Sequence, residues 1–264
     1  MKNGSVLLGN TEMDYVSFGE GEKRLVVLPG LSDGLTTVKG KAWFLSVPYR
    51  KFFRDYTVYL FSRKNDIPEG YSIEDMADDQ ASAMKSLGIG QACVLGGSQG
   101  GMIAQELAIR HPALVEKLIL AVTAPYANET VKAVVSGWME LAERGNHTAL
   151  MSDTAEKMYS ERYLQKYRKA FPYLSKLTKP SDYDRFLKNA DAILRFDARR
   201  ELPKIGCPTL IIAGSDDHTV GTNASSELRS AIAGSELFIY EGLGHGAFEE
   251  AKDFYDRVLA FCSK

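Results

Sequence analysis

The hydrophobic pattern of the chain alternates between short apolar runs and longer segments whose apolar residues recur every three or four positions. The short runs have the length of buried strands, and the longer segments have the spacing of amphipathic helices. Strands are predicted over residues 6–8, 14–18, 24–28, 57–61, 92–95, 117–122, 208–213 and 236–240. Gly9 and Asn10 provide a turn between the first two strands, which predicts an antiparallel pair.

After this pair, strands alternate with helices, which predicts an α/β fold with a doubly wound, mostly parallel sheet and helices on both faces. Helices are expected over residues 42–53 with an interruption at Pro48, and over 72–87, 102–110, 225–232 and 250–261. The charged residues 63–66, which begin with Arg63, are expected to form the turn that ends the strand 57–61.

The alternation stops after the sixth strand. Four helix-like segments follow one another without a strand between them, at residues 128–144, 149–159, 162–177 and 181–199. We therefore expect a core domain of residues 1–124 and 202–264, interrupted by a helical insertion of residues 125–201. The insertion is rich in aromatic residues, of which we expect most in its own core and a minority facing substrate: Trp138, Tyr159, Tyr163, Tyr167, Phe171, Tyr173, Phe186 and Phe196.

Composition narrows the possible partners. A chain of 264 residues that is 45% hydrophobic can bury the core of one α/β domain with an insertion. Its net charge of -2 gives no general attraction to nucleic acid or to an anionic membrane. Residues 1–20 lack the pattern of a signal peptide, and no apolar run is long enough to span a bilayer. These features predict a cytoplasmic protein that acts on a small molecule, and they leave its oligomeric state open.

The cysteines and glycines predict neither a metal nor a cofactor. Cys93, Cys207 and Cys262 lack metal-ligand spacing, and we expect them to be buried free thiols. The chain has no Gly-x-Gly-x-x-Gly after a strand and no phosphate-binding loop. We expect chemistry that uses protein side chains alone.

A serine at the end of the fifth predicted strand is the strongest candidate for that chemistry. Ser98 lies in the sequence Gly96-Gly97-Ser98-Gln99-Gly100, a Gly-x-Ser-x-Gly motif between a strand and a helix. Such a serine occupies a sharp, strained turn that exposes its hydroxyl at the end of the sheet. The flanking glycines leave room for that turn because they have no Cβ atoms.

The chain resembles the α/β-hydrolase family at four places, in the family's order: Leu28-Pro29-Gly30-Leu31, the Ser98 motif, Gly214-Ser215-Asp216-Asp217 and Gly244-His245-Gly246. The resemblance implies a helical cap over the active site, inserted after the sixth strand, and a triad in which Ser98 is the nucleophile and His245 the base. It also implies an oxyanion hole made by the backbone amides of Leu31 and Gln99. Proline stands where the family usually has histidine, and an ordinary Pro-Gly turn is the alternative interpretation.

Two adjacent residues, Asp216 and Asp217, are candidates for the acid of the triad. The family pattern Gly-x-x-Asp places it at Asp217, and Asp216 would then point into solvent or cap the amides of Thr219 and Val220. Glu129, which follows the sixth strand, is a more remote alternative.

The chain has three histidines besides His245. His111 precedes a proline at a helix end and is expected to cap it, and His147 is expected in a turn of the insertion. His218 adjoins the candidate acids and is the rival base. Ser32 and Asp33, after the Pro-Gly turn, are candidate helix caps.

These residues predict hydrolysis of a small-molecule ester or related acyl bond through an acyl-enzyme on Ser98. The same groups would serve a lactonase, a carbon-carbon bond hydrolase or an aminopeptidase similar to proline iminopeptidases. A ligand-binding protein on a hydrolase scaffold, without turnover, is the alternative from another class.

Overall fold

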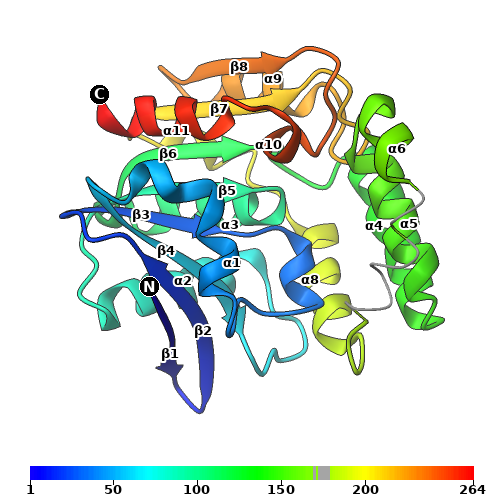
Figure 1. Cartoon of the computed structure of the whole chain (residues 1–264), viewed down its shortest axis with the longest axis horizontal. Helices are drawn as coiled ribbons and strands as arrows, with labels where there is room; N and C mark the ends of the chain where they lie inside the picture. The colour runs from blue at the N-terminus through cyan, green and yellow to red at the C-terminus, as the bar shows by residue number, and fades with distance from the viewer. Residues whose placement is uncertain (169–170, 172–178) are drawn as a thin grey trace.

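The computed structural model describes residues 1–168, 171 and 179–264, and in it eight strands form one sheet in the order β1-β2-β4-β3-β5-β6-β7-β8. All strands from β3 to β8 run parallel to one another, and β2 runs antiparallel to both β1 and β4 (Figure 1). The prediction of a doubly wound, mostly parallel sheet is therefore confirmed. The strand bounds are Lys2–Leu8 (β1), Thr11–Phe18 (β2), Lys23–Leu28 (β3), Tyr56–Lys64 (β4), Ala92–Gly97 (β5), Val115–Ala121 (β6), Thr209–Gly214 (β7) and Glu236–Tyr240 (β8).

Burial along the strands follows their place in the sheet. In β5 and β7 nearly every residue is buried, because helices cover both faces of a parallel sheet. The edge strand β1 is mostly exposed. It begins at Lys2, earlier than its apolar residues predict, since its pairing with β2 and not its hydrophobicity defines it.

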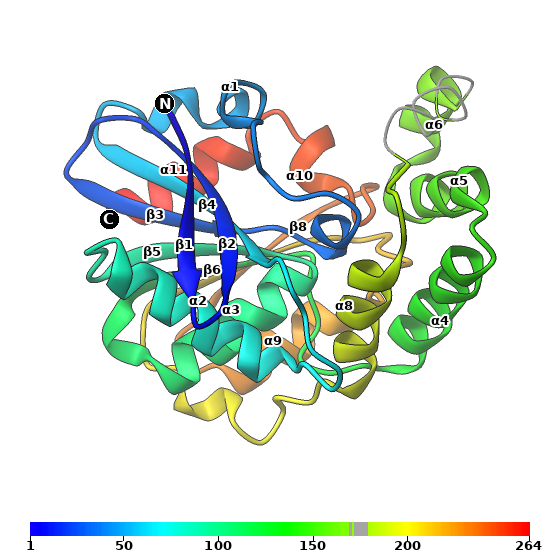
Figure 2. The same cartoon turned by 90° about the horizontal axis from the view of Figure 1, so that it is seen from below.

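Helices cover the two faces of the sheet (Figure 2). On one face lie α2 (Ile73–Ser86), α3 (Gln99–Arg110) and α9 (Ala224–Ala231). On the other lie α1 (Ala42–Leu45), the 3-10 helix η2 (Val47–Phe52), α10 (Ala247–Glu250) and α11 (Phe254–Ser263). Two apolar clusters fill the space on either side of the sheet. Among the described residues, no helix is long and apolar enough to cross a membrane.

Two helical segments differ from their expected form: the segment 42–53, expected to be interrupted at Pro48, and the closing helix, expected to be continuous. The segment 42–53 divides at Ser46 into a short α-helix and a 3-10 helix that contains Pro48. The closing helix expected over 250–261 divides into α10 and α11, because Ala251 adopts an extended conformation. Short 3-10 helices complete the core at Leu31–Gly34 (η1), Pro112–Leu114 (η3) and Leu202–Lys204 (η4).

We call residues 125–201 the helical insertion, and its described helices lie beyond the carboxyl ends of the strands (Figure 1). Its helices are α4 (Glu129–Glu143), α5 (His147–Met158), α6 (Glu161–Tyr167) and α8 (Asp184–Arg195). Backbone hydrogen bonds join its two ends, from Ala127 N to Phe196 O and from Ala198 N to Pro125 O. Most of the helix expected over 162–177 beyond α6, including Tyr173, lies outside the described residues.

The cysteines carry free thiols, as expected, but differ in burial. Cys93 and Cys262 are buried between the sheet and α11, whereas Cys207 is only half-buried in the loop before β7. The expectation that all three are buried is thus wrong for Cys207, because it lies before the buried strand and not within it.

Candidate active site

Ser98 lies on a strained turn between β5 and α3. Its backbone angles are φ 53° and ψ -121°, a left-handed conformation that side-chain-bearing residues rarely adopt. The Ser98 amide donates to Ala121 O at 2.9 Å, and Thr123 Oγ1 donates to the Ser98 carbonyl at 2.7 Å. These bonds to the end of β6 and the residues after it hold the turn in place.

The glycines beside Ser98 allow neighbouring backbone to approach closely. A Cβ on Gly100 would lie 1.9 Å from Leu28 O, and a Cβ on Gly96 would lie 2.3 Å from Gly100 O. Both distances are far below contact, so only glycine fits at either position. The motif therefore brings the loop after β3 directly against the start of α3.

His245 lies in the loop after β8 and joins Ser98 to Asp217. Its Nε2 is 2.9 Å from Ser98 Oγ, and its Nδ1 is 2.9 Å from Asp217 Oδ2. Both His245 and Asp217 are buried. An ionised carboxylate only accepts hydrogen bonds, so it requires the proton on Nδ1 and leaves Nε2 free to accept from the Ser98 hydroxyl.

Asp217 is fixed by its second oxygen. Its Oδ1 accepts from the amides of Thr219 at 2.9 Å and Val220 at 3.0 Å. The sequence had suggested these amides as partners for Asp216 if that side chain did not face solvent. In the structure both amides donate to Asp217 instead, because one carboxylate has enough lone pairs to accept from the two amides and from the imidazole. Asp216 is exposed.

The other candidates lie elsewhere. His111 bonds Asp78 at the end of α3, His147 is the buried first residue of α5, and His218 is exposed. The side chain of Glu129 is 92% exposed and pairs with Lys132 on the surface of α4. Of the four histidines, His245 is the one that the structure places against Ser98.

The two expected oxyanion donors begin helices on either side of Ser98. Leu31 begins η1 and Gln99 begins α3. A Cβ on the preceding Gly30 would lie 3.2 Å from the Ser98 Cβ, so the first loop passes directly beside the serine. Neither the Leu31 amide nor the Gln99 amide donates to an acceptor in the part of the chain that the structure describes. Both N–H groups are thus available to a ligand atom.

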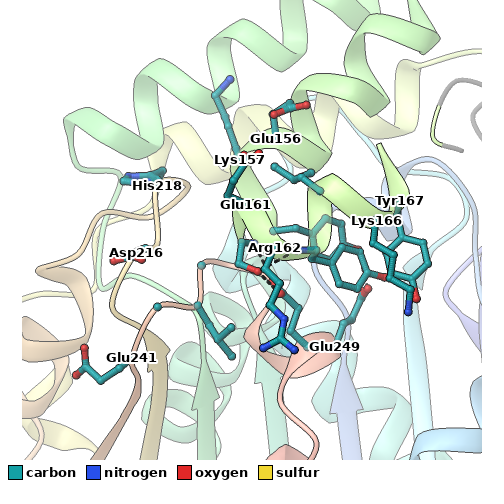
Figure 3. A pocket seen from close by; sticks show the side chains of 18 of the residues that line it. Glu156, Lys157, Glu161, Arg162, Lys166, Tyr167, Asp216, His218, Glu241 and Glu249 are labelled. Carbon is teal, nitrogen blue, oxygen red and sulfur yellow. Dashed lines mark hydrogen bonds between the residues drawn. The ribbon is translucent and has the colours of Figure 1, made fainter. Parts of the chain in front are cut away.

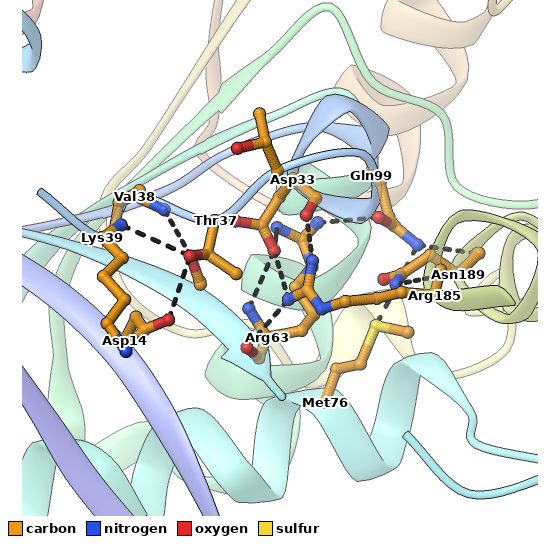
Figure 4. Close-up of polar contacts among 12 residues, drawn as sticks. Asp14, Asp33, Thr37, Val38, Lys39, Arg63, Met76, Gln99, Arg185 and Asn189 are labelled. Atoms are coloured by element: carbon orange, nitrogen blue, oxygen red, sulfur yellow. Dashed lines mark hydrogen bonds and ion pairs between the residues drawn. The ribbon is translucent and has the colours of Figure 1, made fainter. Parts of the chain in front are cut away.

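A buried Asp–Arg cluster behind these donors was missed by the sequence analysis (Figure 4). It consists of Asp33, Arg63, Gln99, Arg185 and Asn189. The expectation that Arg63 belongs to the turn after the strand 57–61 is wrong: it lies within β4, and its side chain is 1% exposed. Asp33 pairs with Arg63 and Arg185 and is no helix cap. The available signal was a charged residue two positions after the apolar run 57–61, but Asp33 and Arg185 are too distant in sequence to be recognised as its neighbours.

A cavity of about 1040 Å³ lies beside the His245 loop (Figure 3). It is bounded by α5 and α6 on one side and by the loops after β7 and β8 on the other, with Asp216, His218 and Gly244 among its lining residues. Ser98 and His245 are not among those residues. Within the described ranges, no group of three or more histidine, cysteine, aspartate or glutamate side chains is placed to hold a metal ion.

Comparison with known proteins places this geometry in a family. The family model described as "alpha/beta hydrolase fold" matches residues 54–252. The chain is 27% identical over 215 residues to a putative carbamate hydrolase, RutD, of Serratia proteamaculans, covering 74% of each chain. It is 30% identical over 201 residues to the AB hydrolase superfamily protein YisY of Bacillus subtilis, covering 73% of this chain and 74% of that one.

Solved structures agree. The enol-lactonase from Burkholderia xenovorans superimposes with a TM-score of 0.85 at 23% identity, over 99% of this chain and 100% of that one. At this identity the similarity concerns the fold alone. The family model, which covers most of the chain, shows that this chain belongs to the α/β-hydrolase family.

Proposed function

We propose that this protein is a serine hydrolase that cleaves an ester or related acyl bond of a small molecule. The observation that carries the proposal is the continuous hydrogen-bonded chain from Ser98 Oγ through His245 to Asp217. A serine hydroxyl is a poor nucleophile at neutral pH, and such a chain supplies the base that it needs and the group that orients that base.

The first half of the reaction acylates Ser98. Ser98 Oγ bonds to the substrate carbonyl carbon while its proton moves to His245 Nε2, and Asp217 stabilises the imidazolium that forms. The carbonyl oxygen becomes an oxyanion and accepts hydrogen bonds from the Leu31 and Gln99 amides. When the tetrahedral intermediate collapses, the bond to the leaving alcohol breaks and His245 returns the proton to that alcohol.

Water completes the cycle by the same route. His245 accepts a proton from water as the water oxygen attacks the acyl carbon, and the proton then passes to Ser98 Oγ as the acid leaves. No cofactor takes part in these steps. The helical insertion lies over this end of the sheet, and we propose that it acts as a cap which selects substrates by size and shape.

Carbamate cleavage is a second candidate. The name of the RutD relatives refers to this reaction, and a carbamate carbonyl is open to the same attack. The intermediate would then be a carbamoyl-enzyme in place of an acyl-enzyme. Comparing p-nitrophenyl acetate with a p-nitrophenyl carbamate separates the two, since the preferred class has the higher kcat/KM.

The proposal is tested by turnover of p-nitrophenyl acetate. Ser98→Ala should reduce turnover to the background rate, because the attacking oxygen is lost. Ser82→Ala, at an exposed serine on α2, is the matched control and should retain full activity. A protein with no turnover on any aryl ester or carbamate, although it binds such compounds, would instead be a ligand-binding member of the fold.

A further inference from the structure

The buried Asp–Arg cluster joins the helical insertion to both expected oxyanion donors (Figure 4). Asp33, two residues after Leu31, accepts through Oδ2 from the Arg63 amide at 2.9 Å and from Arg185 Nη2 at 2.9 Å. Arg63 Nη2 donates to Gln99 Oε1 at 2.8 Å. Gln99 Nε2 donates in turn to the Asn189 carbonyl of α8 at 2.8 Å.

Arg185 makes its contacts from the insertion. Its Nη1 donates to the Asp33 carbonyl, and its Nη2 donates to Asp33 Oδ2 and to the Arg63 carbonyl at 2.9 Å. The planar fork of a guanidinium suits several acceptors at fixed angles, as these are. Both terminal nitrogens of Arg185 donate to the protein, and its Nε is buried without a hydrogen-bond partner among the described residues. Its task is to hold η1 against α8.

Packing at the same place supports that coupling independently. A Cβ on Gly34, the last residue of η1, would lie 2.8 Å from the Cα of Phe186. The backbone of α8 thus lies directly on η1. A shift of α8 would therefore move the loop that carries the Leu31 amide.

The cluster is not arranged for stability alone. It holds two guanidinium groups against one carboxylate, and Asp33 Oδ1 and Arg63 Nε have no hydrogen-bond partner among the described residues. Burial lowers the pKa of Arg63 to about 10, with Arg185 adding to the fall and Asp33 opposing it, so Arg63 stays charged at neutral pH. Buried ion pairs of this kind add little net stability, because desolvation offsets their attraction. Here the ion pairs instead fix the positions of η1, β4 and α8 relative to one another.

We propose that Arg185 is a positioning residue that holds the Leu31 amide and the Gln99 amide at the separation an oxyanion needs. It acts through Asp33 on the first donor and through Arg63 on the second. The inference rests on the proposed function, since it assumes that attack by Ser98 turns the substrate carbonyl oxygen into an oxyanion. It makes the helical insertion part of the catalytic geometry as well as a cover over the site.

The experiment compares Arg185→Met with wild-type protein on p-nitrophenyl acetate and on an aryl trifluoromethyl ketone. Ser98 Oγ adds to the ketone carbonyl carbon while its proton moves to His245 Nε2, and the carbonyl oxygen becomes an oxyanion that no leaving group can relieve. Losing one oxyanion donor outright lowers kcat about 100-fold or more, so displacing donors should lower kcat about 10-fold. We expect KM to change by less than about twofold, and the ketone inhibition constant to rise about as much as kcat falls.

Lys188→Met is the matched control. Lys188 lies one turn along α8 and ties this helix to the Ile67 carbonyl and to Glu69, away from the oxyanion loop. Its replacement removes these contacts but keeps every Arg185 contact to η1, so it should leave kcat and ketone affinity unchanged. Arg185→Lys keeps the charge without the fork and should be intermediate, which preserves the test if Arg185→Met folds poorly. The pH midpoint of kcat should not move in any variant, because Arg185 does not contact His245 or Asp217.

The outcomes separate the two claims. If the wild-type protein turns over the ester and both Arg185 variants keep its kcat, the positioning role alone is overturned. That role is also overturned if the Arg185 variants change only KM, or if Lys188→Met loses as much kcat as Arg185→Met. Wild-type protein that neither turns over aryl esters nor binds the ketone through Ser98 would overturn the proposed function, and the positioning role with it.

Discussion

Replacing Asp217 by asparagine keeps the shape of the side chain and removes the charge beside His245. The asparagine carbonyl can still accept from the amides of Thr219 and Val220, which now bond Asp217 Oδ1 at 2.9 and 3.0 Å. Its amide nitrogen then faces His245 Nδ1 and can only donate. The imidazole must accept there, so its proton moves to Nε2, and the nitrogen that faces Ser98 can no longer take the hydroxyl proton.

The expected loss is therefore large in rate and small in stability. Loss of the orienting group by this tautomer change lowers turnover about 1,000- to 10,000-fold in a triad, equivalent to about 4 to 5.5 kcal/mol in the barrier. The free energy of unfolding should change by about 1 kcal/mol or less, because the two amide hydrogen bonds survive. Asp217→Ala would leave both amides buried without an acceptor and should lose about 2 kcal/mol or more.

Asp216→Asn is the matched control one residue away. Asp216 is exposed, and its side chain contacts only the Ser215 hydroxyl, at 3.2 Å, among the hydrogen bonds of the described residues. Its replacement should leave turnover within about twofold and stability within about 0.5 kcal/mol. The assay is kcat/KM on p-nitrophenyl acetate with thermal melts of all variants. Near-normal activity in Asp217→Asn together with an inactive Asp216→Asn would refute the assignment of the acid.

Two further predictions concern stability. Gly100→Ala should lower the free energy of unfolding by about 3 kcal/mol or more, because the new Cβ would overlap Leu28 O. Gly137 lies in α4 with open space around it, so Gly137→Ala should raise the free energy of unfolding by up to about 1 kcal/mol. Urea denaturation of both variants checks this, and equal effects would contradict it. Burial raises the pKa of Glu106 to about 7 from 4.5, and Glu74 adds to the rise, so the folded state retains a proton that the unfolded state releases. The free energy of unfolding of the wild-type protein, compared with that of Glu106→Gln, should therefore fall by about 1 to 2 kcal/mol between about pH 5 and pH 8. Thermal melts across this range measure the difference between the two proteins, and a difference that does not change with pH would contradict the prediction.

The sequence located the parts of the site that depend on local chain geometry. The glycines around Ser98 and His245 mark tight turns at strand ends, and the parallel sheet brings such ends to one edge. It was therefore possible to predict that Ser98, Asp217 and His245 lie together, as the structure shows, while their catalytic roles stay a proposal.

Contacts between distant segments could not be predicted in the same way. Whether Arg63 is exposed or buried depends on Asp33 and on Arg185 in the insertion, and no local pattern joins these three. The broken closing helix has a similar origin. Ala251 ends α10 in an extended conformation, and the bend before α11 allows Phe254 to pack into the sheet, although the residues from 250 onward have helical spacing.

Labelling with a fluorophosphonate tests the central claim most directly. The serine oxygen displaces fluoride from the reagent's phosphorus, and this requires a base that removes the serine proton and amides that stabilise the phosphoryl oxygen. Intact mass followed by peptide mapping should show one adduct per chain, on Ser98, and none on Ser98→Ala. An adduct on another serine, or folded protein that stays unlabelled, would contradict the account.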